Sequence, residues 1–316
     1  MADNNIGLDI GYGFTKTYTS DGDRIFPTAV TKVVPLATFS DLKPVIVNNE
    51  KFLVGDNALR EGKGLIDTRT TTFVRSNAWV AVLGYALSLN SYSPELNTGD
   101  VIVLGIPPGE YSKKASEEIS MSIRESAISY DNERYTLAES NIKVIPQGAG
   151  IFFSYIMDNH DNFRKNVAVI DIGHYTIDML FFSGGKYIEG ATRSSQIGIS
   201  LILDDVCRAF YRKYRLSIQH KEAYRLVTQG NITILEEPYT IDDMSDIVLP
   251  HASQIISIID GFFENLPNRP EIGIIGGGGV TSLRGFVKLK YKLHIVNDPI
   301  IANAVGYWYY ARGIVG

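Results

Sequence analysis

The stretch "DIGYGFTK", Asp9 to Lys16, returns in most of its pattern at Asp171 to Asp178 as "DIGHYTID". Each copy begins with an aspartate at the end of an apolar run, continues with Ile-Gly and carries a threonine shortly afterwards. An apolar run, a glycine turn and a second run are typical of a β-hairpin. We therefore expect two hairpins, each with an aspartate at its mouth. Two copies in one chain do not make a solenoid repeat.

Composition places the chain among ordinary globular proteins. Its 316 residues, 45% of them hydrophobic, suffice for one large domain or two of roughly 150 residues. The net charge of −5 gives no global reason to bind nucleic acid or an acidic membrane surface. One cysteine, Cys207, excludes an internal disulfide framework, and the polar start "MADNN" lacks a secretory signal. We expect a cytoplasmic protein with no direct nucleic-acid or membrane partner.

Predicted strands and helices alternate along the rest of the chain. Strands are expected in "DRIFPTAV", "DVIVLGIPPGEY", "NIKVIP", "EIGIIG" and "LHIV". Helices are expected from Ser112, as N-cap, to about Tyr130, directly after Gln147, after Gly198, around Gln219 to Thr228 and at the C-terminus. Residues 35–98 form a polar, turn-rich region with a helix around Trp79. This alternation predicts an α/β fold with mixed sheets.

The two hairpins have residues that suit a polyphosphate with a metal ion. Glycines at 11, 13 and 173 allow positive φ, which would direct successive N–H groups at phosphate oxygens. Asp9 and Asp171 suit a hydrated Mg²⁺, which needs few protein ligands. Lys16 could place a point charge on a phosphate. Tight turns and a solvated lysine are the alternative interpretation of the same residues.

Four consecutive glycines, Gly276 to Gly279, follow an apolar strand in "GIIGGGGV". A run without side chains lets a flat ligand approach the backbone, and close strand–helix packing is the alternative use. Thr281 stands where a dinucleotide motif needs its last glycine, and GxxxxGK[ST] is absent. The five histidines have no metal-ligand spacing, so zinc is not expected, and His174 is expected to fill a variable turn position.

The order of these motifs, with Gln147 between the hairpins, resembles the superfamily of actin, sugar kinases and heat-shock chaperone ATPases. "VGDNAL", "LGIPPGEY" and "NDPIIANAVGYWYYA" are similar to the ParM-like branch of bacterial and archaeal actin-like ATPases. The resemblance implies an actin-like, ribonuclease H-like α/β fold of two lobes with a nucleotide cleft. Lobe I would hold residues 1–147 and 299–316 with an insert at about 24–98, and lobe II residues 148–298 with an insert at about 203–270.

The resemblance also assigns roles to residues. Asp9 and Asp171 would hold Mg²⁺ through water, Lys16 would contact phosphate, and Gln147 would orient the attacking water. The phosphate turns would be formed by Gly11, Gly13, Gly173 and Thr176. The adenosine loop would be formed by Gly276, Gly277, Gly278 and Gly279. Glu222 and Arg225 would touch ribose and base. His174 and Tyr175 depart from the smaller residues common in such loops.

Three functions follow from the resemblance. The first is a slow Mg·ATP hydrolase that assembles into filaments of its own copies. Such filaments would segregate plasmids, with a DNA-binding adaptor protein as partner, or would organise the cytoskeleton. The second is a small-molecule kinase, for which Asp178 is a conceivable catalytic aspartate, although its place on the second strand better suits support of the turn. The third is an ATP-binding scaffold that does not polymerise.

Overall fold

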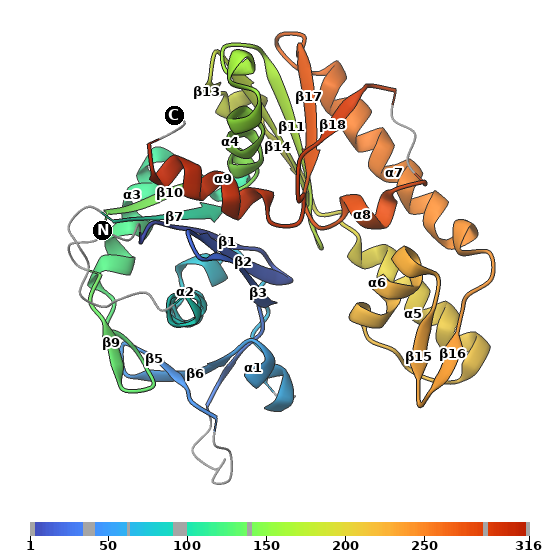
Figure 1. Ribbon diagram of the computed structural model, residues 1–316, viewed down its shortest axis with the longest axis horizontal. Helices are drawn as coiled ribbons and strands as arrows, with labels where there is room; N and C mark the ends of the chain where they lie inside the picture. The colour runs from blue at the N-terminus through green and yellow to red at the C-terminus, as the bar shows by residue number, and fades with distance from the viewer. Residues whose placement is uncertain are drawn as a thin grey trace. The chain divides into compact units, whose positions relative to one another are not determined.

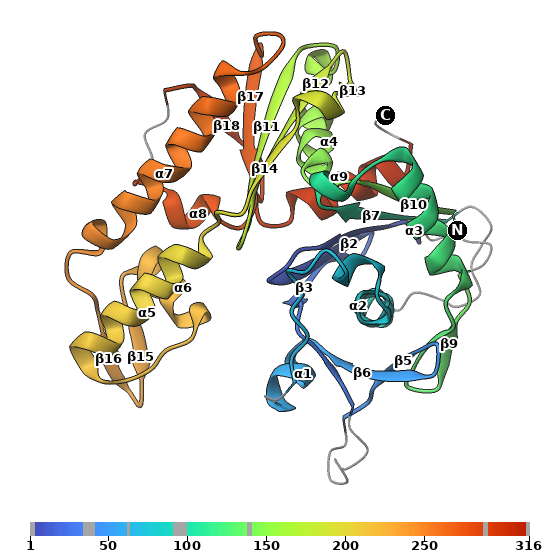
Figure 2. The same ribbon diagram turned by 180° about the vertical axis from the view of Figure 1, so that it is seen from behind.

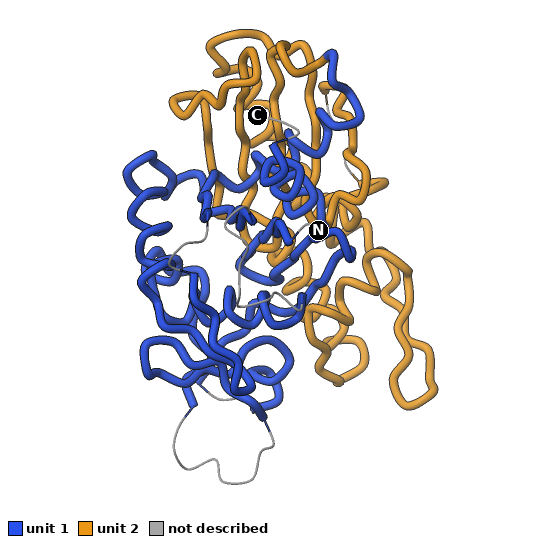
Figure 3. Tube along the Cα trace, turned by 60° about the vertical axis from the view of Figure 1, so that its left-hand side comes forward, with its two compact units in different colours: residues 1–161, 301–316 blue, residues 162–300 orange. Residues whose placement is uncertain are grey.

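The computed structural model describes residues 4–33, 42–61, 64–90, 100–137, 141–286 and 290–313. The chain forms two compact units, residues 1–161 with 301–316 and residues 162–300 (Figure 3). The expected lobes differ from these units by two residues at the second boundary and by more at the first. The second lobe was expected to begin at residue 148, whereas helix α4 (Ala149–Asp158) packs against the C-terminal helix α9 (Ala302–Ala311) within the first unit.

The first unit is built on a mixed sheet in the order β10-β7-β1-β2-β3 (Figure 1). Its strands are β1 (Ile6–Ile10), β2 (Phe14–Thr19), β3 (Gly22–Pro27), β7 (Val101–Ile106) and β10 (Asn141–Pro146). Every residue of β1 and β7 is buried, as central strands covered on both faces require. Helix α3 (Lys113–Glu125) packs on β10, and the Ser112 hydroxyl accepts a hydrogen bond from the Ala115 N–H, which confirms the predicted N-cap.

A second sheet of this unit has the order β4-β6-β5-β8-β9. Its strands are β4 (Val30–Lys32), β5 (Val45–Val47), β6 (Glu50–Val54), β8 (Ile128–Tyr130) and β9 (Glu133–Tyr135). Helix α2 (Asn77–Leu89) packs against strands of both sheets, and its Trp79 is fully buried (Figures 1 and 2). Short helices lie at α1 (Asp56–Glu61), η1 (Phe73–Arg75), η2 (Pro108–Glu110) and η3 (His160–Asn162).

Two predictions in this region were wrong. The helix expected to reach Tyr130 ends at Glu125, because Ile128–Tyr130 pairs with β5 and β9 and buries Ile128 against α2. The strand expected in "DRIFPTAV" is divided after Pro27, and β4 enters the second sheet instead. Of the predicted polar region 35–98, residues 35–41, 62–63 and 91–98 lie outside the described residues.

Helices α4 and α9 touch through their backbones. A Cβ added to Gly306 would lie 1.8 Å from the carbonyl oxygen of Gly150, and one added to Gly150 would lie 2.2 Å from that of Asn303. Helix α9 also lies on the sheet, where a Cβ on Gly7 would come within 2.0 Å of the Ala304 carbonyl oxygen. Small residues at these positions therefore fix how closely the last helix approaches the strands that carry the first hairpin.

The second unit has a mixed sheet in the order β13-β12-β11-β17-β18, with β14 paired to β12 (Figure 2). Its strands are β11 (Val167–Ile172), β12 (Ile177–Ser183), β13 (Lys186–Tyr187), β14 (Arg193–Ser195), β17 (Ile272–Gly276) and β18 (Leu293–Ile295). The short helices η4 (Glu189–Ala191) and α8 (Val280–Leu283) follow β13 and β17. Strand β11 is buried along its whole length, as its continuous apolar sequence predicted.

The helices of the second unit are α5 (Ser200–Tyr214), α6 (His220–Gln229) and α7 (Met244–Glu264). Helix α5 contacts both α6 and α7, and a hairpin of β15 (Ile232–Ile234) and β16 (Glu237–Tyr239) follows α6. Helix α7, which contains Pro250, was not predicted from the sequence. None of the helices in the described ranges has both the length and the apolar character needed to cross a bilayer.

Candidate functional site

The two "DIG" stretches form hairpins of identical register. In β1–β2, Asp9 pairs with Lys16 and Ile10 with Thr15. In β11–β12, Asp171 pairs with Asp178 and Ile172 with Ile177. The first and eighth residues of each quoted stretch therefore lie directly opposite each other. Both hairpins were predicted correctly, and the two stretches that share a sequence pattern also share a strand register.

Asp9 lies at the mouth of the first hairpin and is 4% exposed. Lys16 Nζ donates to its Oδ2 at 3.0 Å, and Gln147 Nε2 donates to its Oδ1 at 3.2 Å. The hairpin register brings Asp9 and Lys16 together, and the fold adds Gln147 from a distant part of the chain. Each oxygen of the buried carboxylate therefore accepts a hydrogen bond, one from the lysine cation and one from the glutamine amide. The ion pair holds Lys16 beside the turn.

Gln147 is held by a network that fixes its orientation. Its Nε2 also donates to the carbonyl oxygen of Ile10 at 3.1 Å, so both amide hydrogens are used, and its backbone N–H donates to the Ile106 carbonyl oxygen at 2.7 Å. The side-chain oxygen Oε1 is the group that remains to accept a hydrogen bond. Its position after β10 and before α4 agrees with the predicted strand-to-helix junction.

Asn303 of α9 supports this junction, and the sequence analysis missed it. Its Oδ1 accepts hydrogen bonds from the N–H groups of Gly148 at 3.1 Å and Ile151 at 3.3 Å. The side chain therefore caps the first turn of α4 from another helix. A buried amide inside the apolar stretch "ANAVGYWYYA" was the available signal, because a buried polar side chain needs partners.

The reason given for the hairpin glycines was wrong. Neither Gly11 nor Gly173 has a φ in the left-handed region. Space is the requirement instead, because a Cβ on Gly11 would lie 2.9 Å from the Phe14 carbonyl oxygen and one on Gly173 would lie 3.1 Å from that of Thr176. The turn after β1 is further held by Thr28 N–H, which donates to the Gly13 carbonyl oxygen at 3.0 Å.

Asp171 lies opposite a second buried carboxylate, that of Asp178. Directly opposed residues of an antiparallel pair point to the same face, so two acidic side chains share one face of the sheet. Asp178 accepts from the hydroxyls of Thr176 at 3.2 Å and Ser194 at 2.5 Å. Asp171 backs onto Gly277, where a Cβ would come within 2.3 Å of its Oδ1. The acidic pair makes this face suitable for a cation.

Replacing Asp178 with alanine is expected to lower the free energy of unfolding by about 1–3 kcal/mol, because two hydroxyls lose their buried acceptor. Denaturant unfolding followed by circular dichroism measures this change. Ser194→Ala, which leaves the Thr176 contact in place, serves as the control and should cost less. Unchanged stability together with lost activity would instead give Asp178 a direct part in the chemistry.

The four residues of the glycine loop differ in backbone conformation, hydrogen bonds and surrounding space. Gly277 has φ +92° and its N–H donates to the Pro299 carbonyl oxygen, while the N–H of Gly279 donates to that of Ile172. A Cβ on Gly279 would meet Ile172 Cγ2 at 2.4 Å, whereas one on Gly278 would meet nothing within 4 Å. Gly276 ends β17. Gly278 is therefore the position where the loop leaves room for a ligand.

Glu222 and Arg225 lie on α6, which contacts α8, the helix that follows the glycine loop. One oxygen of Glu222 accepts from the Gln219 N–H at 2.8 Å and so caps its own helix. Arg225 is exposed. Helix α6 therefore lies near the glycine loop. The cap that Glu222 forms on its own helix was not predicted from the sequence.

A chain of hydrogen bonds joins the second hairpin to α5 and α6. His174 Nε2 lies 3.2 Å from His220 Nδ1, and His220 Nε2 lies 2.8 Å from Asp204 Oδ1. The Tyr175 ring contacts the His174 ring edge-on at 4.4 Å. The prediction that His174 only fills a variable position was incomplete. No sequence spacing indicated this chain, because the fold brings its members together from three elements.

These groups fit a phosphate ligand and a hydrated divalent cation better than a metal bound directly by the protein. No group of three or more His, Cys, Asp or Glu side chains within the described ranges is arranged to hold a metal ion. A magnesium ion that keeps most of its waters needs only one or two carboxylates, and each unit has them separately: the buried Asp9 in the first, and the opposed pair Asp171 and Asp178 in the second.

Comparisons with known proteins give two domain matches. Residues 7–150 match the N-terminal domain of actin-like proteins, and residues 169–288 match the C-terminal domain of the archaeal actin homologue, MreB-like. No curated protein sequence matches the chain.

Solved structures with the same fold cover nearly the whole chain. An archaeal actin homologue has a TM-score of 0.76 at 20% identity, covering 98% of this chain and 99% of its own. The same homologue in complex with ADP has a TM-score of 0.74 at 19% identity, covering 98% and 99%. A subunit of a 15-stranded ParM filament from Clostridium botulinum has a TM-score of 0.75 at 22% identity, covering 99% and 100%.

Proposed function

Because this chain belongs to the actin-like superfamily, we propose that it binds ATP with Mg²⁺, hydrolyses it slowly and assembles with copies of itself in a nucleotide-dependent way. The observation that carries the proposal is the pair of hairpins of identical register, each with a buried aspartate as its first residue. In this proposal each hairpin is a phosphate-binding turn of its own unit.

The first hairpin would supply positive charge and a fixed polar group. Lys16, held against Asp9 at 3.0 Å, can donate its remaining hydrogens to phosphate oxygens. Gln147 donates both amide hydrogens within the protein, so its oxygen Oε1 can accept a hydrogen bond from a water molecule and orient it. Glutamine is neutral and a poor general base, which predicts slow hydrolysis.

The second hairpin would supply negative charge for a hydrated cation. Asp171 and Asp178 share one face, and Asp171, the first residue of the hairpin, is the proposed partner of the cation's waters. When bound, Mg²⁺ would neutralise phosphate charge that develops during transfer. Thr176 and Gly173 form the turn beside it, where a small residue is required for space.

The nucleoside would lie against the glycine loop at Gly278, where a side chain would fill open space. Gly277 and Gly279 would act by keeping the loop close to β11, since their N–H groups already donate within the protein. Glu222 and Arg225 of α6 are the proposed contacts for ribose and base. Among these, Arg225 is the more available, because Glu222 caps its helix.

Self-assembly is proposed from the likeness to a filament subunit, and a DNA-binding adaptor would be the partner if the assembly segregates plasmids. A kinase with a small-molecule acceptor is not favoured, because both oxygens of Asp178 accept hydrogen bonds from hydroxyls of the protein. Asp178 therefore suits support of the turn more than proton abstraction.

To test the proposal, light scattering and phosphate release are both measured after Mg·ATP is added. The buffer contains no sugar, so that no small-molecule acceptor is present. We expect slow phosphate release and scattering that begins above a critical protein concentration. Turnover that requires a small-molecule acceptor would contradict the proposal in favour of a kinase. ATP binding without release or scattering would contradict it in favour of a scaffold.

Replacing Gln147 with alanine is expected to slow hydrolysis by up to about a hundredfold and to leave ATP affinity nearly unchanged, because the proposed role is to orient water. Single-turnover phosphate release and equilibrium binding of ATP measure the two quantities. Gln147→Glu is the companion variant. It removes both donated hydrogen bonds and places a second carboxylate beside Asp9, so it should also lower the melting temperature. Equal losses of binding and turnover in the alanine variant would make Gln147 a structural residue.

A further inference from the structure

The turn that joins β15 and β16 has an unexpected sequence for its backbone. Leu235 has φ +49° and Glu236 has φ +69°. The same pair of positive φ values occurs in two other hairpins of the chain, at Asn48 with Asn49 and at Asp131 with Asn132. Asparagine and aspartate are the residues that such turns favour, whereas a leucine with positive φ is strained. Two of these three turns therefore have residues that their backbone conformation favours, and the turn at Leu235 and Glu236 does not.

Leu235 gains no burial in exchange for this strain, because its side chain is 93% exposed. The unfavourable backbone conformation lowers the stability of the isolated chain, and the exposed side chain adds no hydrophobic stabilisation to offset it. Local rules of this kind are usually broken where a residue has a function outside the fold. Glu236 and Glu237 beside it are also exposed, so the end of the hairpin presents one apolar side chain next to two carboxylates. Leu235, Glu236 and Glu237 are called the tip.

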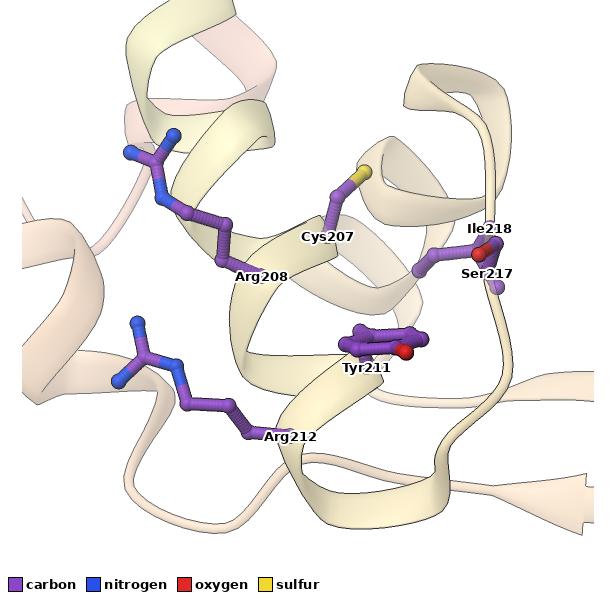
Figure 4. A pocket seen from close by; sticks show the side chains of 6 residues that line it. All are labelled: Cys207, Arg208, Tyr211, Arg212, Ser217 and Ile218. Carbon is purple, nitrogen blue, oxygen red and sulfur yellow. The ribbon is translucent and has the colours of Figure 1, made fainter.

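A cavity of about 310 Å³ lies at the C-terminal half of α5 and the segment that follows it (Figure 4). It is called the socket and is lined by Cys207, Arg208, Tyr211, Arg212, Ser217 and Ile218. In Figure 4 the side chains of Cys207 and Tyr211 point toward the segment of Ser217 and Ile218, whereas the guanidinium groups of the two arginines extend to the other side of the helix. The socket thus has an apolar wall beside a basic one.

The charges of the tip and the socket are complementary. Arg208 is paired with Asp205 on its own helix. Arg212 and Arg215 are exposed and form no ion pair with any residue that the structure describes. Glu236 and Glu237 of the tip likewise have no ion-pair partner in the described ranges. The tip therefore has two carboxylates without an ion pair beside a leucine, and the socket has one such guanidinium group, that of Arg212, beside apolar side chains.

We propose that the tip of one copy of this chain inserts into the socket of a second copy, with Leu235 against Tyr211 and Ile218 and a tip carboxylate on Arg212. The tip and the socket are different surfaces, so the contact is heterologous and leaves a free tip and a free socket after each addition. It can therefore propagate. The inference rests on the proposed self-assembly and assigns the residues that make one of its contacts.

The single native cysteine allows a direct test, since Cys207 lines the socket. In the Leu235→Cys variant, the introduced thiol and Cys207 of the next copy should form a disulfide when diamide removes one hydrogen from each thiol. Burial raises the pKa of the Cys207 thiol, so the oxidation is carried out at pH 9. We expect reducible oligomers and, by mass spectrometry of the peptides, a link between positions 207 and 235.

Two controls identify the contact. Leu235→Cys combined with Cys207→Ser should form no oligomers, and Asn132→Cys, at the exposed end of the β8–β9 hairpin with the same turn, should not link to Cys207. Links between two positions 235, or no links at a concentration where the wild type scatters light, would overturn the proposal. Links that form although Mg·ATP produces neither scattering nor phosphate release would uphold the contact and contradict the proposed function instead.

A second variant separates binding from stability. Leu235→Asn with Glu236→Gly gives the turn its favoured residues, so the melting temperature should rise by a few degrees. The critical concentration for assembly should rise by about ten- to a hundredfold, because a buried leucine is lost from the contact. If the tip has only a structural role, the melting temperature should still rise and the critical concentration should not change. An unchanged critical concentration would overturn the proposal.

Discussion

Replacing Asp171 with asparagine is expected to reduce Mg·ATP hydrolysis by about a hundredfold or more, a loss typical of removing one preorganised charge from a transition state. The substitution keeps the size of the side chain and removes its charge. Asp171 is buried at the end of β11 and shares a face with Asp178, so the second hairpin would lose the carboxylate proposed to hold the waters of Mg²⁺.

Phosphate release measured against Mg²⁺ concentration tests this expectation. The matched control is Asp178→Asn, which changes the opposite residue of the same cross-strand pair and should affect stability more than Mg²⁺ dependence. Circular dichroism should show that the Asp171 variant remains folded. Normal phosphate release at ordinary Mg²⁺ concentration would remove Asp171 from the proposed site.

Replacing Gly306 with alanine is expected to destabilise the first unit by about 3 kcal/mol or more, at the upper end of the cost of overpacking. The added Cβ would lie 1.8 Å from the carbonyl oxygen of Gly150, and its three nearest atoms are all backbone. No side-chain rotation relieves such a contact. Helices α4 and α9 would have to separate, which would also displace Asn303 and the start of α4 beside Gln147.

Tryptophan fluorescence during denaturant unfolding measures this effect, because both tryptophans of the chain, Trp79 and Trp308, are buried in the first unit. Gly261→Ala, followed by circular dichroism because α7 lies in the second unit, provides the control. Gly261 lies inside α7, where a Cβ would meet nothing within 4 Å, so alanine should stabilise that helix by up to about 1 kcal/mol. Equal stabilities of the two variants would show that α4 and α9 accommodate a methyl group.

Local sequence patterns predicted the elements that position the candidate site. An aspartate at the end of an apolar run followed by a glycine turn predicted both hairpins, and the pattern around Gln147 predicted a strand-to-helix junction. These features depend on neighbours within about eight residues. The hairpin register alone places Asp9 opposite Lys16, so the sequence could predict both residues as part of the site.

Features that depend on distant parts of the chain were not predicted. Asn303 caps a helix that begins more than a hundred residues earlier, and the chain of His174, His220 and Asp204 joins three elements. Strand β8 was taken as the end of a helix, because its partner β5 lies elsewhere in the sequence. The role of the hairpin glycines was misjudged because φ and free space both favour glycine and only coordinates distinguish them.

The C-terminal helix has a consequence for synthesis on the ribosome. Helix α9 covers β1, β2 and β7 and packs on α4, yet all of these elements are synthesised before it. Residues 162–300 are complete before it emerges, so the second unit can finish folding first although the first unit begins the chain. Until then the strand that carries Asp9 lacks its cover, and a nascent chain halted near residue 300 would expose apolar surface that binds chaperones.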